Sequence, residues 1–347
     1  MKTMRYKLFG TGTGLYVSEL VLGAAMFGTA SGYGADKDET QKILQGYTEA
    51  GGNFIDTADQ YQLGESERLI GEFIAPNRND FVISSKYSRS SSANPSMGRL
   101  GNHRKAMVQA VEESLKRLKT DHIDIYFAHL DDCVTPVGEI VRGFEDLIQS
   151  GKIIYGGLAN FPAWKVATAA TIANLRGSTP LSAVQVEYNL LQRAADRELL
   201  PMAEGFGLGT MLYSPLAGGL LTGKYRKGES GRITLIGNIQ QKNAERNDAV
   251  IDVLIAVAEE TGTGPGQVAI AWASTKGGFP IIGPRNRTHL NDNLLAADIQ
   301  LSQDQVMRLD EVSAVSLDYP HELNAAQRKV MTGDKLAQTK FPERIVV

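Results

Sequence analysis

The sequence predicts a parallel α/β fold that closes as a (β/α)8 TIM barrel. Eight short β-rich runs alternate with segments whose apolar residues recur at helical spacing, which is the order of a parallel sheet with helical crossovers. Eight is also the number of strands that closes such a barrel. Glycines follow several helical segments, as expected where helices end. An open doubly wound sheet is the alternative, because counting strands does not prove closure.

In chain order, the predicted strands cover residues 19–24, 53–56, 81–86, 123–129, 153–160, 183–188, 209–214 and 279–283. The helical segments between them include residues 40–50, 105–118, 137–149, 162–175 and 198–204. Residues 1–18 lie before the first barrel strand and predict an N-terminal hairpin, in which residues 8–10 and 16–18 flank a turn. Residues 216–246 form a long glycine-rich connection after the seventh strand, of the kind that is usually functional or disordered.

The C-terminal residues 302–347 begin as a helix for which Ser302 is the candidate cap, and then lose helical periodicity. We interpret them as a tail that packs over one end of the barrel. Because no internal repeat or charged block interrupts the chain, residues 1–347 are expected to form one domain.

Composition narrows the class of protein. The chain has 347 residues, and 42 % of them are apolar, which is enough for a full hydrophobic core. Its formal net charge of −3 indicates no basic surface that would bind nucleic acid. Its one cysteine, Cys133, excludes an internal disulfide and a cysteine-built metal site. We find neither a signal peptide nor an apolar run of membrane-spanning length. A cytoplasmic protein without a membrane partner is therefore expected.

The glycines at positions 10, 12 and 14 superficially suggest a dinucleotide-binding loop. Such a loop needs the G-x-G-x-x-G spacing and a helix after it, whose N-terminus receives the phosphates. Here the glycines are followed by Leu15, Tyr16 and Val17, which favour a strand. We therefore interpret them as the turn of the hairpin.

Four polar residues gather where predicted strands end. Asp56, Lys86 and His129 end the second, third and fourth strands, and Tyr61 follows Asp56 by five positions. Each has an ordinary explanation alone: a turn former, a packed ring, a solvated amine and a hydrogen-bonded histidine. Because a barrel brings the carboxyl ends of its strands to one mouth, all four together predict a common site.

These four side chains suit protonation of a carbonyl oxygen. A free tyrosine, with a pKa of about 10, is a poor acid at neutral pH. A lysine ammonium beside the phenol favours the phenolate, and an aspartate keeps the lysine charged. A neutral histidine can orient the carbonyl and stabilise negative charge on its oxygen. Such a site holds a proton donor but no hydride source, so a nicotinamide cofactor would have to supply the hydride.

From about Leu8 to about Gln300 the chain resembles the aldo-keto reductase superfamily. The resemblance is carried by four blocks, at residues 53–67, 123–129, 157–161 and 213–225. The last block resembles the version found in the bacterial and potassium-channel β-subunit-like branches. The resemblance implies that Asp56, Tyr61, Lys86 and His129 form a catalytic tetrad, with Tyr61 as the proton donor.

The resemblance also implies NADPH as the cofactor, with NADH as a weaker alternative. In it, Asn160 and Gln185 bond the carboxamide, Tyr213 stacks on the nicotinamide ring, and residues 214–221 with Lys224 surround the pyrophosphate. Polar strand ends that face solvent are the alternative for Asn160 and Gln185. The full set of expected cofactor-binding residues is Met26, Asp56, Asn160, Gln185, Tyr213, Ser214, Pro215, Leu216, Gly218, Lys224, Gly283, Arg285, His289 and Asn293.

Arg285 and Arg287 stand where the resemblance implies a 2′-phosphate at a helix N-terminus, which favours NADPH. His289 and Asn293 are expected near the adenine. Three positions depart from the family pattern. Ala159 stands where serine is frequent, Gln62 follows Tyr61 where glycine is usual, and His289 replaces a glutamine or glutamate.

The expected activity is reduction of an aldehyde or ketone substrate to an alcohol, without a metal, because the histidines lack metal-binding spacing. Expected substrate contacts come from Phe27, Tyr61, Tyr87, His129 and Trp164. A nicotinamide-nucleotide-sensing subunit with weak turnover is one alternative. A lyase or isomerase that uses Lys86 as a Schiff base is another. The sequence predicts neither the physiological substrate nor the oligomeric state.

Overall fold

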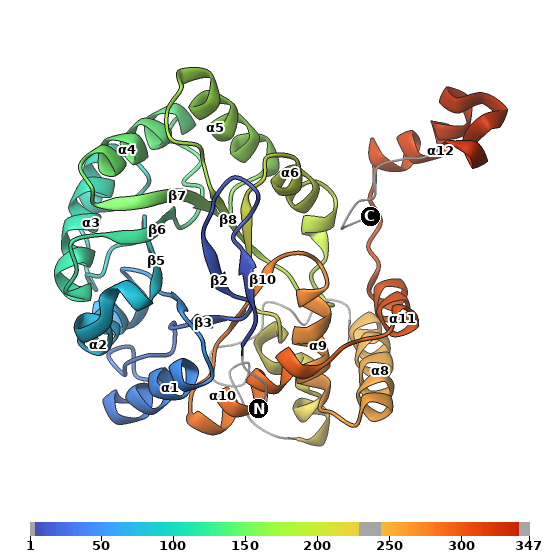
Figure 1. Cartoon of the computed structure of the whole chain (residues 1–347), viewed down its shortest axis with the longest axis horizontal. Coiled ribbons are helices and arrows are strands. Elements are labelled where there is room, and N and C mark those ends of the chain that lie inside the picture. The colour runs from blue at the N-terminus through green and yellow to red at the C-terminus, as the bar shows by residue number, and fades with distance from the viewer. Residues whose placement is uncertain (1–3, 229–243, 340–347) are drawn as a thin grey trace.

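A computed structural model describes residues 4–228 and 244–339, and Figure 1 shows their arrangement. Eight parallel strands close into a barrel in the order β10-β3-β4-β5-β6-β7-β8-β9. Their bounds are β3 Val21–Gly23, β4 Phe54–Asp56, β5 Val82–Tyr87, β6 Ile123–Ala128, β7 Ile153–Ala159, β8 Ala183–Glu187, β9 Gly209–Tyr213 and β10 Phe279–Ile282. Because β10 pairs with both β3 and β9, the predicted barrel is confirmed and the open sheet is wrong.

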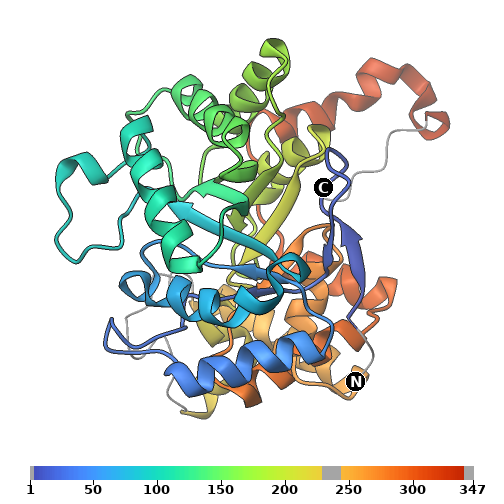
Figure 2. The same cartoon turned by 60° about the vertical axis from the view of Figure 1, so that its left-hand side comes forward.

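Helices surround the barrel (Figures 1 and 2). Their bounds are α1 Lys37–Glu49, α2 Glu65–Ile74, α3 Arg104–Leu118, α4 Val137–Gln149, α5 Ala163–Arg176, α6 Leu199–Gly205, α8 Ala244–Thr261, α9 Pro265–Ser274, α10 Arg287–Leu294, α11 Gln303–Ser313 and α12 His321–Thr332. A typical example is α4, which buries Ile140, Phe144 and Leu147 at helical spacing. This apolar stripe holds α4 against the outer face of the strands.

Alternation along each strand decides which side chains reach the barrel interior. In β5, Val82 packs inside the barrel with Phe54 and Phe127, whereas Ile83 and Tyr87 belong to the outer layer between strands and helices. With a period of two, Lys86 shares the inner face with Val82. The strand therefore delivers one charged side chain to the inside of the barrel at its carboxyl end.

The N-terminal hairpin closes the opposite end of the barrel. β1 (Tyr6–Leu8) pairs antiparallel with β2 (Tyr16–Ser18), so the hairpin is confirmed, with its first arm two residues earlier than predicted. The Phe9 ring lies 5.6 Å from that of Phe54 and 5.3 Å from that of Phe279, centroid to centroid. Gly10, with φ +70°, leaves no room for a Cβ against the backbone at Gly209. The glycines thus form a close-packed turn, far from the ends of β4 and β5.

The long connection after β9 is only partly described. Residues 217–222 and 224–227 form two 3-10 segments, and α8 begins at Ala244. The rest of the predicted 216–246 loop, at residues 229–243, lies outside the described residues. Within residues 4–228 and 244–339, no helix is both long and apolar enough to cross a membrane.

The C-terminal region differs in part from its prediction. Ser302 caps α11, because its hydroxyl accepts a hydrogen bond from the amide of Gln305 at 3.2 Å. Arg197 then forms an ion pair with Asp318 at 2.8 Å, which joins the following segment to the barrel. Beyond it, α12 extends away from the barrel (Figure 1), and most of its described side chains are exposed. The expectation of a tail packed over a barrel end is therefore wrong for residues 321–332, and residues 340–347 of that tail lie outside the described residues.

Candidate active site

A buried ion pair lies inside the barrel where β4 and β5 end. Lys86 Nζ donates hydrogen bonds to both carboxylate oxygens of Asp56, at 2.8 and 2.7 Å, and to the carbonyl of Thr57 at 2.7 Å. Asp56 also accepts from the Ser84 hydroxyl at 2.7 Å. The side chain of Lys86 has no exposed area, and that of Asp56 is 4 % exposed. The strand parity described above explains why these residues meet, since the side chains of Asp56, Ser84 and Lys86 all point into the barrel.

Tyr61 and His129 complete the group. Tyr61 begins the 3-10 turn Tyr61–Gly64 after β4, and its ring centroid lies 5.1 Å from Lys86 Nζ. The rings of Tyr61 and His129 are 5.8 Å apart and nearly perpendicular. Burial lowers the pKa of Lys86, but Asp56 and Tyr61 outweigh it, so the net shift of that pKa is upward. The structure thus brings together all four residues of the predicted tetrad, with the lysine charged.

His129 is held as a neutral ring. Burial, followed by repulsion from Lys86 and Arg89, lowers the pKa of His129 to about 2. The backbone amide of His129 donates to the Ser88 hydroxyl at 3.1 Å, which fixes the residue at the end of β6. Its Nδ1 is buried and has no hydrogen-bond partner among the described residues. A ligand can therefore reach the ring only through Nε2, which suits a hydrogen bond to a substrate oxygen.

Two amides expected at the nicotinamide adjoin the tetrad. Gln185 is 3 % exposed, and its Nε2 donates to Asp56 Oδ1 at 2.9 Å. Asn160 Nδ2 donates to the carbonyl of His129 at 2.9 Å, and Asn160 Oδ1 accepts from the Tyr213 hydroxyl at 2.9 Å. The alternative of a solvent-facing strand end is therefore wrong for Gln185. Its Oε1 atom and the polar groups around Asn160 suit a carboxamide.

The segment after β9 makes a cradle of backbone. Ser214, Ala217, Gly218 and Gly219 all have positive φ, between 49° and 98°, which turns the chain tightly. A Cβ on Gly219 would lie 3.2 Å from Lys224 Cε and 3.5 Å from its Nζ, so glycine leaves the lysine room. Successive amides in such turns, beside an ammonium, bind anions. The residues present therefore fit the pyrophosphate of a dinucleotide.

Positive groups gather near the start of α10. Burial, then Arg285 and Lys224, lower the pKa of His289, which places the three side chains within electrostatic reach of one another. Asn286 caps the helix by accepting from the His289 amide at 2.8 Å. This donor set fits a phosphate at a helix N-terminus. Asn293 is nearly buried in the same helix.

Arg287 does not join this group. Its Nη1 donates to the carbonyl of Lys42 at 2.9 Å, and its Nη2 pairs with Glu49 at 3.2 Å. Both partners belong to α1, so the guanidinium lies against that helix. The expectation of a second arginine at the 2′-phosphate is therefore wrong.

The remaining cofactor candidates contribute little polar chemistry of their own. Met26 and Pro215 are buried, Leu216 packs against the core, and Gly283 is exposed with open space around its Cα. The carbonyl of Ser214 accepts from Asn189 Nδ2 at 3.0 Å.

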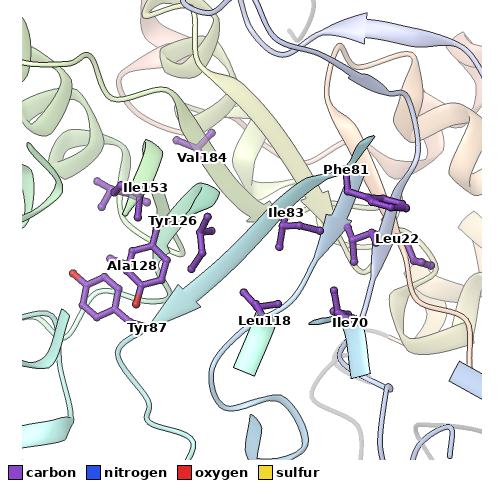
Figure 3. Packing of buried hydrophobic residues seen from close by; sticks show 14 of the residues in the cluster. Leu22, Ile70, Phe81, Ile83, Tyr87, Leu118, Tyr126, Ala128, Ile153 and Val184 are labelled. Carbon is purple, nitrogen blue, oxygen red and sulfur yellow. The ribbon is translucent and has the colours of Figure 1, made fainter. Parts of the chain in front are cut away.

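The expected substrate contacts differ in where their side chains lie. Tyr87 is fully buried on the outer face of β5 and stacks on Tyr126, with ring centroids 5.4 Å apart (Figure 3). Its hydroxyl donates to the carbonyl of Asn102. Phe27 is also fully buried, in the same core layer. These two side chains do not reach the mouth, because strand parity and core packing turn them away from it. Trp164, at the start of α5, is 65 % exposed.

A second buried group was missed by the sequence interpretation. Glu67 accepts from the Ser85 hydroxyl at 2.6 Å and from Arg117 Nε at 2.7 Å, directly outside β5. Asp59 lies beside it, and burial and Glu67 raise the pKa of Asp59 to about 7, against the opposing effect of Arg117. The sequence signal for this group was that Ser85 precedes Lys86 in one strand, so that Ser85 points out of the barrel where Lys86 points into it. In the described part of the chain, no three His, Cys, Asp or Glu side chains form a group that could hold a metal.

Comparison with known proteins agrees with this geometry. The aldo/keto reductase family model matches residues 19–314. Aldo-keto reductase ausK of Aspergillus calidoustus is 34 % identical over 336 residues, which cover 92 % of this chain and 84 % of the relative. Aryl-alcohol dehydrogenase [NADP(+)] of Phanerodontia chrysosporium is 34 % identical over 344 residues, or 93 % and 89 % of the two chains. Norsolorinic acid reductase of Aspergillus flavus is 31 % identical over 326 residues, or 91 % and 82 %.

These relatives are fungal, so the bacterial and channel-subunit branch suggested by residues 213–225 stays a prediction. The family match covers every strand of the barrel and all four residues of the tetrad. The chain therefore belongs to the aldo/keto reductase family.

Proposed function

We propose that this chain is an oxidoreductase that uses NADPH to reduce an aldehyde or ketone to an alcohol, with Tyr61 as the proton donor. The observation that carries the proposal is the buried Lys86–Asp56 pair beneath Tyr61, next to a histidine held neutral. This arrangement has one acidic hydroxyl, one fixed positive charge and one neutral donor around a single position.

Each residue has a distinct role in the proposed reaction. NADPH, when bound, supplies the hydride. His129 Nε2–H donates a hydrogen bond to the carbonyl oxygen and orients it, and Tyr61 gives that oxygen its proton. The charge of Lys86 stabilises the phenolate that Tyr61 leaves behind, and Asp56 keeps this charge in place through two hydrogen bonds. In the oxidative direction, Tyr61 takes the proton back.

The preference for NADPH over NADH is supported by the positive groups near α10. A 2′-phosphate beside Arg285 would gain charge-assisted hydrogen bonds that a 2′-hydroxyl does not, and Lys224 adds a second positive charge nearby, whereas the lowered pKa of His289 leaves that ring neutral. One relative also carries NADP(+) in its name. Asn160 and Gln185 would hold the carboxamide, and Tyr213 would lie against the ring.

An aromatic aldehyde is the substrate class that we would test first. A relative named aryl-alcohol dehydrogenase covers most of the chain, and the exposed indole of Trp164 offers a flat apolar surface. The Schiff-base alternative is disfavoured by Lys86 itself. A lysine nucleophile needs a lowered pKa, whereas Lys86 is fully buried, bonded to three acceptors and shifted upward.

The test combines a substrate panel with one substitution. Aldehydes, quinones, sugars and polycyclic ketones are incubated with NADPH or NADH, and nicotinamide absorbance is followed. Replacement Tyr61→Phe should lower kcat by about 10²- to 10⁴-fold, the range of general acid catalysis, and leave NADPH affinity within about twofold. Tyr16→Phe, at an exposed hairpin tyrosine, is the matched control. Tight NADPH binding without turnover of any carbonyl would support the sensing subunit instead.

A further inference from the structure

The turn after Tyr61 has an unusual backbone. Gln62 and Leu63 have φ of 50° and 53°, and Gly64 has φ of 82°, so three successive residues are left-handed. For a residue other than glycine, this conformation is sterically unfavourable. Leu63 is partly exposed, whereas Gln62 is only 3 % exposed. A buried glutamine in a strained backbone indicates that its side chain compensates for the strain.

The Gln62 side chain bonds the connection that follows β3. Its Oε1 accepts from the amide of Ser31 at 2.9 Å, and its Nε2 donates to the carbonyl of Tyr33 at 2.9 Å. One helical turn later, Glu65 Oε2 accepts from the amides of Thr29 and Ala30, at 2.7 and 2.9 Å. Four hydrogen bonds from two side chains therefore fix the segment of residues 28–34, which we call the 28–34 loop.

The base of the 28–34 loop is also tightly closed. The amide of Gly28 donates to the carbonyl of Ala35 at 2.8 Å, and the amide of Ala35 donates to the carbonyl of Met26 at 2.7 Å. A Cβ on Gly34 would lie 2.0 Å from the Gly28 carbonyl oxygen. Residues 29–33 are nevertheless exposed, and Tyr33 is 38 % exposed. The loop is thus anchored at both ends, and Gln62 of the Tyr61 turn and Glu65 at the start of α2 hold its middle.

Its place in the barrel puts the 28–34 loop at the mouth. β3 pairs with β4, and the loop leaves the same end of β3 at which β4 presents Asp56. Gln62 is the neighbour of Tyr61 in the chain, so a hydrogen bond from Gln62 to the loop fixes the loop relative to the phenol. The 28–34 loop consequently lies beside the turn that carries the proposed proton donor.

We propose that Gln62 is a positioning residue that, with Glu65, holds the 28–34 loop against the Tyr61 turn and thereby selects carbonyl substrates by size. The selection rests on the proposed reductase function, whereas the attachment of the loop does not. A rigid wall excludes or orients bulky substrates and leaves small ones unaffected. Loss of the attachment therefore changes KM for large carbonyls and leaves kcat for small carbonyls unchanged.

Amide hydrogen exchange tests the attachment without any nucleotide or substrate. Gln62→Gly removes two side-chain hydrogen bonds to the loop and relieves the backbone strain, so the fold is retained. We expect exchange in the 28–34 loop to rise about tenfold, the effect of losing about 1–2 kcal/mol of protection. Leu63→Gly is the matched control, because it relieves the same strain at the next residue and leaves the hydrogen bonds intact.

Kinetics test the selection. The ratio of kcat/KM for naphthaldehyde to that for propanal should change about three- to tenfold in Gln62→Gly, through KM, and stay constant in Leu63→Gly. Equal exchange in Gln62→Gly and in the unsubstituted chain would overturn the proposal, as would a rise of the same size in Leu63→Gly. Faster exchange with an unchanged ratio would refute the selection. If no carbonyl is reduced at all, the proposed function fails, and exchange still decides the attachment.

Discussion

Lys86 Nζ lies within 2.8 Å of both carboxylate oxygens of Asp56, and the two side chains are 0 % and 4 % exposed. Desolvation of two charges is costly, and it is offset only where every polar atom of the pair is bonded. Here the carbonyl of Thr57, the hydroxyl of Ser84 and the amide of Gln185 complete the bonding. The pair is thus held rigid at the place where a fixed positive charge is needed.

Breaking this pair should destabilise the fold. Lys86→Met leaves the Asp56 charge buried without its partner, which should lower the free energy of unfolding by about 3–5 kcal/mol. The double variant Lys86→Met/Asp56→Asn should recover much of this loss, because no unpaired charge stays behind. Urea denaturation followed by circular dichroism measures both. Lys37→Met, which removes an exposed pair with Glu72, is the control and should change the free energy of unfolding little. Simple additivity of the two substitutions would contradict this account.

His129 should not titrate in the working range of the enzyme. With its pKa lowered to about 2, mainly by burial, the ring stays neutral at any higher pH used in an assay. The pH profile of kcat should therefore lack an inflection near the ordinary histidine value of about 6.5 that depends on His129. His129→Asn, which keeps a neutral donor, should lower kcat by up to about 10²-fold without changing the shape of the profile. An inflection that this substitution abolishes would show that His129 is charged instead.

Strand ends were the part of the site that the sequence could predict. Asp56, Lys86 and His129 lie within one residue of the ends of successive strands, and barrel closure brings such ends together without further information. Tyr87 was misplaced because it follows Lys86 directly, and neighbouring residues of a strand point to opposite faces. Arg287 was misplaced because its partners lie on α1, more than 200 positions away in sequence. No local pattern contains that contact.

Helix α9 shows a different limit of sequence interpretation. Its residues from Gly266 to Ala273 are all buried, so the segment has no polar face and no amphipathic stripe to recognise. The turn at Gln62 shows the opposite case. The sequence shows that Gln62 stands where glycine is usual, but only the structure shows which backbone groups its side chain bonds.

Arg285 should discriminate between the two nicotinamide nucleotides. Arg285→Ala should weaken NADPH binding by about 10- to 100-fold, the value of a charge-assisted hydrogen bond, and leave NADH binding within about twofold. Arg287→Ala is a sharp control, because that arginine is two positions away but is bonded to α1. It should affect neither nucleotide. Titration calorimetry measures the dissociation constants of both nucleotides for the unsubstituted chain and the two variants, and an equal loss for both nucleotides in Arg285→Ala would refute the 2′-phosphate role.

Asp59 should make stability depend on pH. Its carboxyl is buried beside Glu67, and its pKa is raised from 3.8 to about 7, with Arg117 and the amides of Gln60 and Ser90 opposing the shift. A raised pKa means that the folded chain binds the proton more tightly than the unfolded chain. The resulting stability is fully present below about pH 4 and is lost as the pH rises through about 7.

The unsubstituted chain should therefore lose up to a few kcal/mol of unfolding free energy between about pH 4 and about pH 8, relative to Asp59→Asn. The asparagine keeps an oxygen acceptor for the two amides but carries no charge at any pH, so its variant lacks this part of the pH dependence. Asp80→Asn, at an exposed carboxylate, controls for the change in net charge. Urea denaturation at the two pH values measures the difference. Parallel pH dependences for the unsubstituted chain and Asp59→Asn would mean that Asp59 is already ionised at low pH, because the Arg117 charge outweighs its burial.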